Sequence, residues 1–339
     1  MAAFVVDCRD TPDDAAGNLG RGAERRKSMW LPDEHGLLHR HDVLDSGVTQ
    51  RELEAAIASG ELVLVSRGVY LQESRISESS RYRGDVLYRA RCLAVGAAKP
   101  GEQPALLSHD SAAALHGLPV LLPTRTRVHR FAQRPHGGNA KERKTVFHTG
   151  TVPDEDIVEV DGVRVTGLAR TVVDLALTGP FHRALAAFDA GLARGLDRDE
   201  LAERLAVRRR GVGTARFALR HANPLADNPG ESWCRAQVIE ARLPIPALQV
   251  RHDLRDGSVA YVDLDFDGQV VVEFDGLTKY RQATIGSKHS PEEVVIREKL
   301  REDKLRELGL DMVRTVWQEL RDASFIPVLT DHLGRRGLC

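Results

Sequence analysis

Residues 261–276 read Tyr261-Val-Asp-Leu-Asp-Phe-Asp-Gly-Gln-Val-Val-Val-Glu-Phe-Asp-Gly276, and this stretch decides the fold of the last third of the chain. The Val, Phe and Tyr residues on either side of Asp267-Gly268 are typical of two strands joined by a tight turn. The strands also carry acids. Strands this apolar are normally buried, and a buried carboxylate needs a partner or a metal ion.

The turn decides whether these acids share a face of the sheet, because side chains alternate along a strand and a shift of one residue reverses the faces. An odd-length loop places Asp263 and Glu273 together, and a two-residue loop separates them. We expect the three-residue turn Phe266-Asp267-Gly268, with Gly268 in the left-handed conformation. This turn predicts two faces: Asp263, Asp265, Glu273 and Asp275 on one, and Val262, Leu264, Val272 and Phe274 on the other.

A shared face has two interpretations. Carboxylates on one face repel one another unless a cation lies among them, and oxygen ligands suit Mg²⁺ or Mn²⁺. Alternatively the face is exposed, with solvated acids beside Lys and Arg.

The flanking segments predict the other elements of this region. Asn228-Pro-Gly-Glu231 is typical of a helix N-terminus, with an Asn cap, Pro in the first turn and Glu at the capping-box position. We expect a strand over 247–254 and a turn at Asp256-Gly257 before the acidic hairpin. A helix then starts at Ser290-Pro291 and stops at Gly309, and a strand over 311–317 and a terminal helix follow.

This order of elements resembles the PD-(D/E)XK nuclease superfamily, and specifically its small Vsr-like branch, over residues 228–339. The matching pieces are Val262-Asp263, Val272-Glu273-Phe274-Asp275-Gly276, Glu298-Lys299, Arg301-Glu302-Asp303, Gly309 and Val313-Arg314-Thr315-Val316-Trp317.

The resemblance implies a Mg²⁺- or Mn²⁺-dependent DNA endonuclease, in which Asp263 and Glu273 are metal ligands and Glu231 is an acid near the metal. Such a site performs metal-assisted phosphodiester hydrolysis. The sequence departs from the usual Glu-x-Lys, since Asp275 stands in the lysine position. Lys279 is then the candidate to orient or activate a water, and it also fits an ordinary surface lysine. Glu231 fits a helix-capping residue equally well.

The start of the chain predicts a DNA-binding unit over residues 28–75. An apolar-patterned segment over 37–43 precedes the capping box Thr49-Gln-Arg-Glu52, which begins a helix over 51–59 closed by Gly60. Strands over 62–65 and 68–71 follow, joined at Ser66-Arg67. Two helices and a basic-tipped hairpin form a winged helix-turn-helix.

Three residues are the candidates for DNA contact in this unit. We expect Gln50 and Arg51 to read base edges and Arg67 to contact phosphate or the minor groove. The alternative for each is a solvated polar position on a helical hairpin that contacts protein.

The segment from His39 to Tyr70, which ends in Arg67-Gly-Val-Tyr70, is similar to the N-terminal domain of AbiEi-type antitoxins, the transcriptional autorepressors of type IV toxin–antitoxin operons. Residues 107–119 and 163–176 resemble a helix and a strand-to-helix segment of that family's second domain, which predicts an α/β middle domain over 82–222. His116 and Asp174 fit packing and capping in this domain, and we assign them no chemistry.

The resemblance implies double-stranded DNA and a cognate nucleotidyltransferase-like toxin as partners, and it is compatible with a homodimer. Two basic runs also suggest a phosphate-contacting surface. The first consists of Arg125, Arg127, His129, Arg130, Arg134, Lys141, Arg143 and Lys144, interleaved with Phe131 and Phe147. The second consists of Arg204, Arg208-Arg-Arg210, Arg216 and Arg220.

The overall composition fits an α+β protein of two or three domains. The chain has 339 residues and a net charge of −1, so local patches must carry any affinity for nucleic acid. Its 4 cysteines lack metal-ligand spacing, which favours a reduced cytoplasmic protein without a zinc or disulfide framework. No apolar run is long enough to span a membrane, and residues 1–27 are expected to be a disordered leader.

Two functions therefore remain open from the sequence. In the first, the chain is a transcriptional repressor or antitoxin whose nuclease-like end is an inactive scaffold. In the second, the DNA-binding domains deliver an active nuclease. The missing lysine favours the first function, and the retained Asp263 and Glu273 favour the second.

Overall fold

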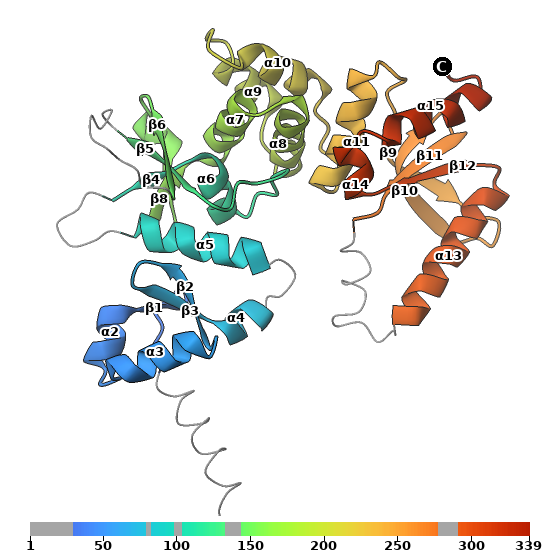
Figure 1. Cartoon of the computed structure of the whole chain (residues 1–339). Coiled ribbons are helices and arrows are strands. Elements are labelled where there is room, and N and C mark those ends of the chain that lie inside the picture. Colours follow the sequence, from blue (N-terminus) through green and yellow to red (C-terminus); the bar gives the residue numbers. More distant parts are fainter. Residues whose placement is uncertain (1–29, 79–82, 98–103, 133–143, 277–290) are drawn as a thin grey trace, which may run out of the picture. The chain divides into compact units, whose positions relative to one another are not determined.

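The computed structural model describes residues 30–78, 83–97, 104–132, 144–276 and 291–339, and its contacts divide the chain into two compact units, residues 1–78 and 79–339 (Figure 1). No helix in the described part of the chain combines the length and apolarity needed to cross a membrane. The expected leader over 1–27 lies outside the described residues.

Unit 1 is a small α+β body whose three strands pair in the order β1-β3-β2. Its elements are β1 (Leu37–His39), α2 (Arg40–Asp45), α3 (Gln50–Ala58), β2 (Leu62–Ser66), β3 (Val69–Gln72) and α4 (Glu73–Glu78). Thr49 and Glu52 form the predicted capping box at the start of α3. The apolar start predicted over 37–43 is not one element, because Leu37 and Leu38 pair with Leu71 and Tyr70 as a strand before the helix begins.

The first part of unit 2 contains a five-stranded mixed sheet in the order β6-β5-β4-β8-β7. Its elements are α5 (Arg83–Gly96), β4 (Leu106–Leu107), α6 (His109–His116), β5 (Val128–Ala132), β6 (Thr145–Thr149), η1 (Asp154–Asp156), β7 (Ile157–Val160) and β8 (Val163–Thr166). The helices α7 (Leu168–Thr178), α8 (Phe181–Ala193), α9 (Arg198–Arg204) and α10 (Val212–His221) follow. Their apolar faces share one core, which is built largely of Ala, Leu and Val.

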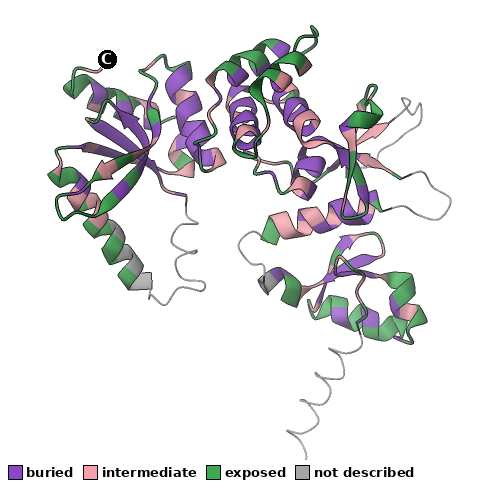
Figure 2. Cartoon of the chain, turned by 180° about the vertical axis from the view of Figure 1, so that it is seen from behind, coloured by how far each residue is buried: buried purple, intermediate pink, exposed green. Residues whose placement is uncertain are grey.

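The last part of unit 2 is a four-stranded sheet in the order β12-β11-β10-β9, with helices on both faces. Its elements are α11 (Pro229–Glu240), β9 (Ala247–Asp253), β10 (Val259–Phe266), β11 (Val270–Phe274), α13 (Pro291–Glu307), β12 (Asp311–Thr315), α14 (Trp317–Arg321) and α15 (Phe325–Arg335). The order of helices and strands expected from the sequence is present. Figure 2 shows the central strands coloured as buried.

The hairpin between β10 and β11 has a three-residue loop, one residue further along than expected. Phe266 pairs with Val270, so the loop is Asp267, Gly268 and Gln269. Asp267 and Gly268 have left-handed φ values of 52° and 64°, a conformation that glycine adopts without strain and that Asp tolerates. The register places Asp263 opposite Glu273, since Leu264 pairs with Val272.

The alternation of side chains along β10 breaks at Asp263, contrary to the expectation that Val262 and Leu264 share a face. Leu264 packs with Val272 and Phe274 in the core beneath α11 and α15, whereas Val262 packs with Val271 and Leu305 of α13. Gln249 on the neighbouring strand has a left-handed φ of 49°. The backbone N–H of Phe274 donates to the Asp263 carboxylate over 2.8 Å, so this side chain bonds the neighbouring central strand β11.

Candidate functional site

Asp263 and Glu231 lie on either side of Gln249. The Gln249 amide Nε2 is 3.2 Å from a Glu231 oxygen and 3.5 Å from an Asp263 oxygen. Burial raises the pKa of the nearby Cys234 thiol well above its ordinary value, and the charges of Asp263 and Glu231 raise it further. The two acids are therefore buried and linked through Gln249.

Glu231 also closes the N-terminus of α11, as its capping position predicts. It accepts hydrogen bonds from the backbone N–H of Asp227 at 2.9 Å and from the Asn228 amide at 2.5 Å. The Asn228 side chain in turn accepts from the N–H groups of Gly230 and Glu231. This capping accounts for the burial of Glu231 without a metal.

The Glu273 carboxylate lies beside two arginine side chains. Its carboxylate forms an ion pair with Arg301 of α13, and Arg314 of β12 lies 3.9 Å away. Arg301 also donates to the backbone carbonyl of Tyr261, and Arg314 pairs with Glu302 at 2.9 Å. Positive charge beside Glu273 is therefore supplied by two arginine side chains.

The Asp265 carboxylate, also on this hairpin, has structural partners. Asp265 lies 2.7 Å from His252 Nε2 and accepts a hydrogen bond of 2.6 Å from the Gly268 backbone N–H, which supports the turn. Asp275 is half-buried, and its backbone N–H donates to Thr315. Lys279 lies outside the described residues.

A site for Mg²⁺ or Mn²⁺ at this hairpin would need several ligand atoms close together. Among the residues that the structure describes, no three acidic, histidine or cysteine side chains of this sheet bring their ligand atoms within 4.8 Å of one another. Glu273 is paired with Arg301, and Asp263 accepts a hydrogen bond from the Phe274 backbone, so each of these two carboxylates has a protein partner.

The predicted DNA-reading residues lie at the exposed start of α3. Arg51 is exposed, and Gln50 is held by two neighbours. The Arg40 guanidinium donates to the side-chain oxygen Oε1 of Gln50 over 2.7 Å, and the side-chain Nε2 of Gln50 donates to the Glu54 carboxylate over 2.5 Å. Arg67 is exposed in the β2–β3 turn, where the register shifts between Leu64 and Ser66.

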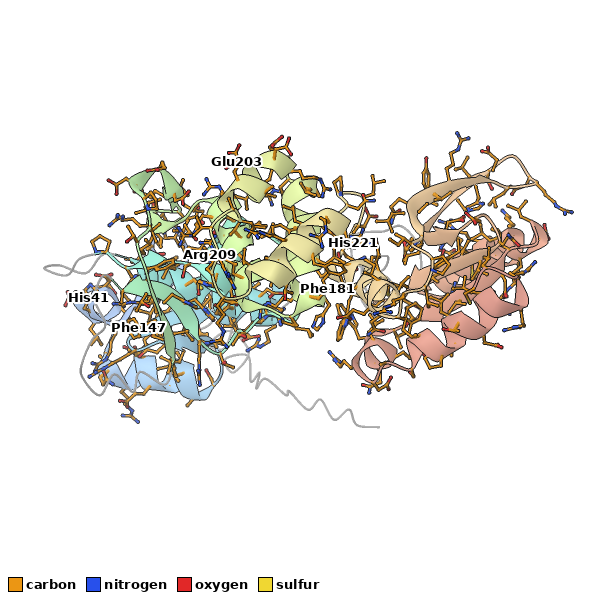
Figure 3. The ribbon with its side chains drawn as sticks, turned by 90° about the horizontal axis from the view of Figure 1, so that it is seen from above. His41, Phe147, Phe181, Glu203, Arg209 and His221 are labelled. Carbon is orange, nitrogen blue, oxygen red and sulfur yellow. The ribbon has the colours of Figure 1, made fainter. Side chains whose placement is uncertain are left out.

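The basic run of the middle region is distributed over different environments. Arg125 pairs with Asp85 at 2.5 Å, and Arg127 is exposed. Arg130 lies over the ring of Phe147, 4.9 Å from its centroid; Figure 3 labels Phe147. Of these three arginines, Arg127 has the side chain most accessible to a phosphate.

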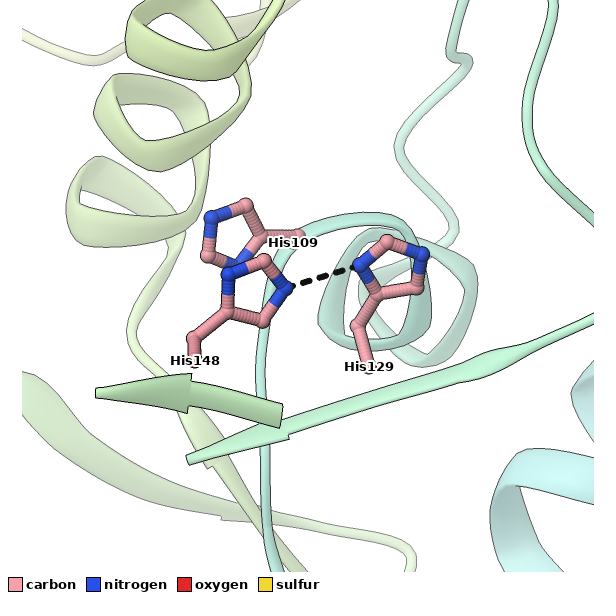
Figure 4. Close-up of side chains that lie close together, drawn as sticks. All are labelled: His109, His129 and His148. Atoms are coloured by element: carbon pink, nitrogen blue, oxygen red, sulfur yellow. Dashed lines mark hydrogen bonds between the residues drawn. The ribbon is translucent and has the colours of Figure 1, made fainter. Parts of the chain in front are cut away.

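A histidine cluster that the sequence did not reveal lies on the five-stranded sheet (Figure 4). His109 begins α6, His129 lies on β5 and His148 lies on β6, and one ring nitrogen of each is within 4.8 Å of the others. His129 Nδ1 is 3.0 Å from His148 Nε2, and the rings of His109 and His148 stack with centroids 3.6 Å apart. The pairing of β5 with β6 explains why these histidines are close. Phe131 pairs with His148, and His129 lies two residues before Phe131 on the same face of β5.

His109 is buried and His129 and His148 are half-buried, and this environment lowers the pKa of each imidazole. Burial and the neighbouring histidines lower the pKa of His109 to about 2. Burial and His129 lower the pKa of His148 to about 4, and burial also lowers the pKa of His129. Neutral imidazoles present lone pairs rather than charge.

Comparison with known proteins gives a family match for part of unit 2. Residues 104–220 match the model of the AbiEi antitoxin C-terminal domain. The chain is similar to an uncharacterized protein of Mycobacterium tuberculosis strain CDC 1551, with 26% identity over 283 residues that cover 81% of this chain and 92% of that protein. It has the same similarity to an uncharacterized protein of Mycobacterium tuberculosis strain H37Rv.

Proposed function

We propose that the chain is a DNA-binding transcriptional regulator of the AbiEi antitoxin type, in which unit 1 is a winged helix-turn-helix. The AbiEi match over residues 104–220 carries this proposal. The topology of unit 1 supports it, since α2 and α3 are followed by a hairpin, and the sheet order is β1-β3-β2. In a winged helix the second helix enters the major groove and the hairpin contacts the backbone.

The start of α3 is the proposed base-reading surface. Arg51 is exposed there, and the bonds that Gln50 makes with Arg40 and Glu54 are also exposed. Exposed polar pairs contribute little to stability, so Gln50 can exchange them for a base edge at small cost. Arg40, which the sequence did not single out, is thereby released toward a phosphate.

DNA binding is tested by fluorescence anisotropy with a duplex from upstream of the chain's own gene and a scrambled duplex of equal length. Arg51→Ala should weaken binding to the upstream duplex by ~5- to 150-fold, the range of one base contact worth ~1–3 kcal/mol. Arg67→Ala should weaken binding to both duplexes alike and lower the slope of log affinity against log salt by about 1.

The charge-matched control is Arg335→Ala, which removes an exposed arginine of α15 that pairs with Asp331. Its affinity should equal that of the wild type. Equal affinities for the upstream and scrambled duplexes, unchanged by Arg51→Ala, exclude sequence-specific reading by α3.

A toxin is the second proposed partner, because the matched family consists of antitoxins. Co-expression of the chain with the product of the adjacent gene should suppress that product's toxicity if it is a nucleotidyltransferase-like toxin.

Mg²⁺- or Mn²⁺-dependent DNA cleavage by a PD-(D/E)XK-like domain over residues 228–339 is the second candidate function. The register that sets Asp263 opposite Glu273, with Glu231 linked through Gln249, favours it. The pairing of Glu273 with Arg301 opposes it. Plasmid cleavage by the wild type that is lost in Glu273→Ala supports the enzyme, and an intact plasmid with both ions supports a regulator with a nuclease-like scaffold.

A further inference from the structure

The imidazoles of His109, His129 and His148 come from three separate elements and lie close together. Packing alone leaves one of their nitrogens without a hydrogen-bond partner in the part of the chain that the structure describes. His129 Nε2 is buried without a hydrogen-bond partner among the described residues. The nearest acid to it is Asp110, at 3.8 Å. Buried polar atoms normally have partners. The other nitrogen of this ring, Nδ1, faces His148 Nε2 at 3.0 Å, so both nitrogens of His129 lie in a polar environment beside the cluster.

We propose that His109, His129 and His148 bind one divalent transition-metal ion of the zinc class. Three imidazole nitrogens suit Zn²⁺, Ni²⁺, Co²⁺ or Cu²⁺, whereas Mg²⁺ and Ca²⁺ prefer oxygen. A site with three protein ligands leaves a fourth position for water or a further ligand. Tetrahedral ligands at ~2.0–2.1 Å lie ~3.3 Å apart, and the three nitrogens are within 4.8 Å of one another. Because imidazole lone pairs lie in the ring plane, the stacked rings of His109 and His148 must turn relative to each other when the ion binds.

The backbone around the site is fixed by buried hydrogen bonds. The Ser108 N–H donates to the His129 carbonyl at 3.0 Å, and the His129 N–H donates to Ser111 Oγ at 2.8 Å. Tyr88 lies 2.8 Å from the same Ser111 hydroxyl. Ser108 Oγ lies 3.0 Å from His109 Nδ1 and orients that ring. Such outer contacts hold ligands in place in metal sites.

The positive charges of the two arginines near the site are offset by carboxylates. Arg183 is the closest cation to Asp110, and its Nη2 lies 2.5 Å and 2.6 Å from the two Asp110 oxygens. Arg170 is paired with Asp174 at 2.9 Å and with Asp156 at 3.4 Å. Each arginine is thus matched by carboxylate, and the neutral imidazoles remain available as ligands.

The first test measures metal binding to the full chain, purified without a histidine tag and stripped with a chelator. Titration with Co²⁺ should give one bound ion per chain with visible absorption of a four-coordinate nitrogen site. It should show no sulfur charge-transfer band, which excludes the exposed thiol of Cys339 as a ligand. Zn²⁺ should displace the Co²⁺. A wild type that binds neither ion, or that shows the sulfur band alone, overturns the proposal.

The second test assigns the ligands. His148→Gln, His129→Gln and His109→Gln should each weaken Co²⁺ binding by more than ~10-fold, because even the loss of an outer residue that bonds a ligand costs about that much. His41→Gln is the matched control, because His41 is exposed in unit 1. Zn²⁺ should raise the melting temperature of the wild type and of His41→Gln but not of His148→Gln. Equal Co²⁺ affinity in all four variants overturns the proposal even if a variant is less stable.

Discussion

The carboxylate of Asp189 on α8 and the guanidinium of Arg235 on α11 form a buried ion pair, with both Asp189 oxygens 2.6–2.7 Å from Arg235 Nη2. Asp189 is 1% exposed and Arg235 is 3% exposed. Ser232 and the Asn223 backbone N–H complete the partners of Asp189. This pair joins the AbiEi-like helices to the C-terminal sheet, so the two parts of unit 2 are coupled through α11.

Removing one partner of this pair should be strongly destabilising. Arg235→Met leaves the Asp189 charge buried without its cation, and such losses are ~3–5 kcal/mol. Urea unfolding followed by tryptophan fluorescence measures the change. The control is Arg335→Met, which breaks the exposed Arg335–Asp331 pair and should change stability by less than ~1 kcal/mol. A similar small effect in both variants means that the buried pair does not couple α8 to α11.

A second prediction concerns the close approach of α11 to the sheet. A Cβ on Gly230 would lie 2.1–2.6 Å from three ring atoms of Phe274, which is buried. Gly230→Ala should therefore destabilise the protein by ~1–3 kcal/mol through overpacking. Gly213→Ala on α10 is the matched control, since nothing lies within 4 Å of its Cβ and it should stabilise the helix by ~0.5–1 kcal/mol. Equal melting temperatures for the two variants contradict this packing argument.

Local signals in the sequence predicted most of the elements. The Thr49–Glu52 capping box and the Asn228 cap mark the starts of α3 and α11, because these side chains satisfy backbone groups within one turn of helix. The Asp267-Gly268 turn was also predicted locally, because these residue types tolerate the left-handed conformation that the turn needs. The strand over Leu37–His39 was not, since it forms through pairing with β3, a contact that local sequence does not encode.

The candidate sites depended more on tertiary contacts. The partners of Glu273 come from α13 and β12, and Arg301 and Arg314 are ordinary basic residues in sequence. The histidine cluster needed the parallel register of β5 and β6, which sets Phe131 beside His148. A period-2 pattern through His129 and Phe131 was the one available signal. It shows the face of a strand but not which strand lies beside it.

A third prediction separates the two roles of Glu273. If Glu273 serves chiefly as the partner of Arg301 and Arg314, Glu273→Ala should lower the melting temperature, because it leaves partly buried arginines with less compensating charge. Adding Mg²⁺ should change neither variant, as thermal unfolding with Mg²⁺ or EDTA will show. A rise in melting temperature with Mg²⁺ in the wild type alone identifies Glu273 as a metal ligand instead.

The last prediction concerns the pH dependence of stability through His116. Burial lowers the pKa of His116 below its ordinary value, and its ring Nε2 bonds the Thr166 carbonyl at 2.7 Å. Arg194 also lowers this pKa. The unfolded chain therefore takes up a proton at higher pH than the folded protein does. The stability that neutral His116 contributes is present above the unfolded pKa of ~6.5 and is lost as pH falls toward the folded value.

His116→Gln, which keeps a donor, should show a shallower loss of urea midpoint between neutral and mildly acidic pH than the wild type. Parallel midpoint curves for the two proteins contradict a buried neutral imidazole at this position.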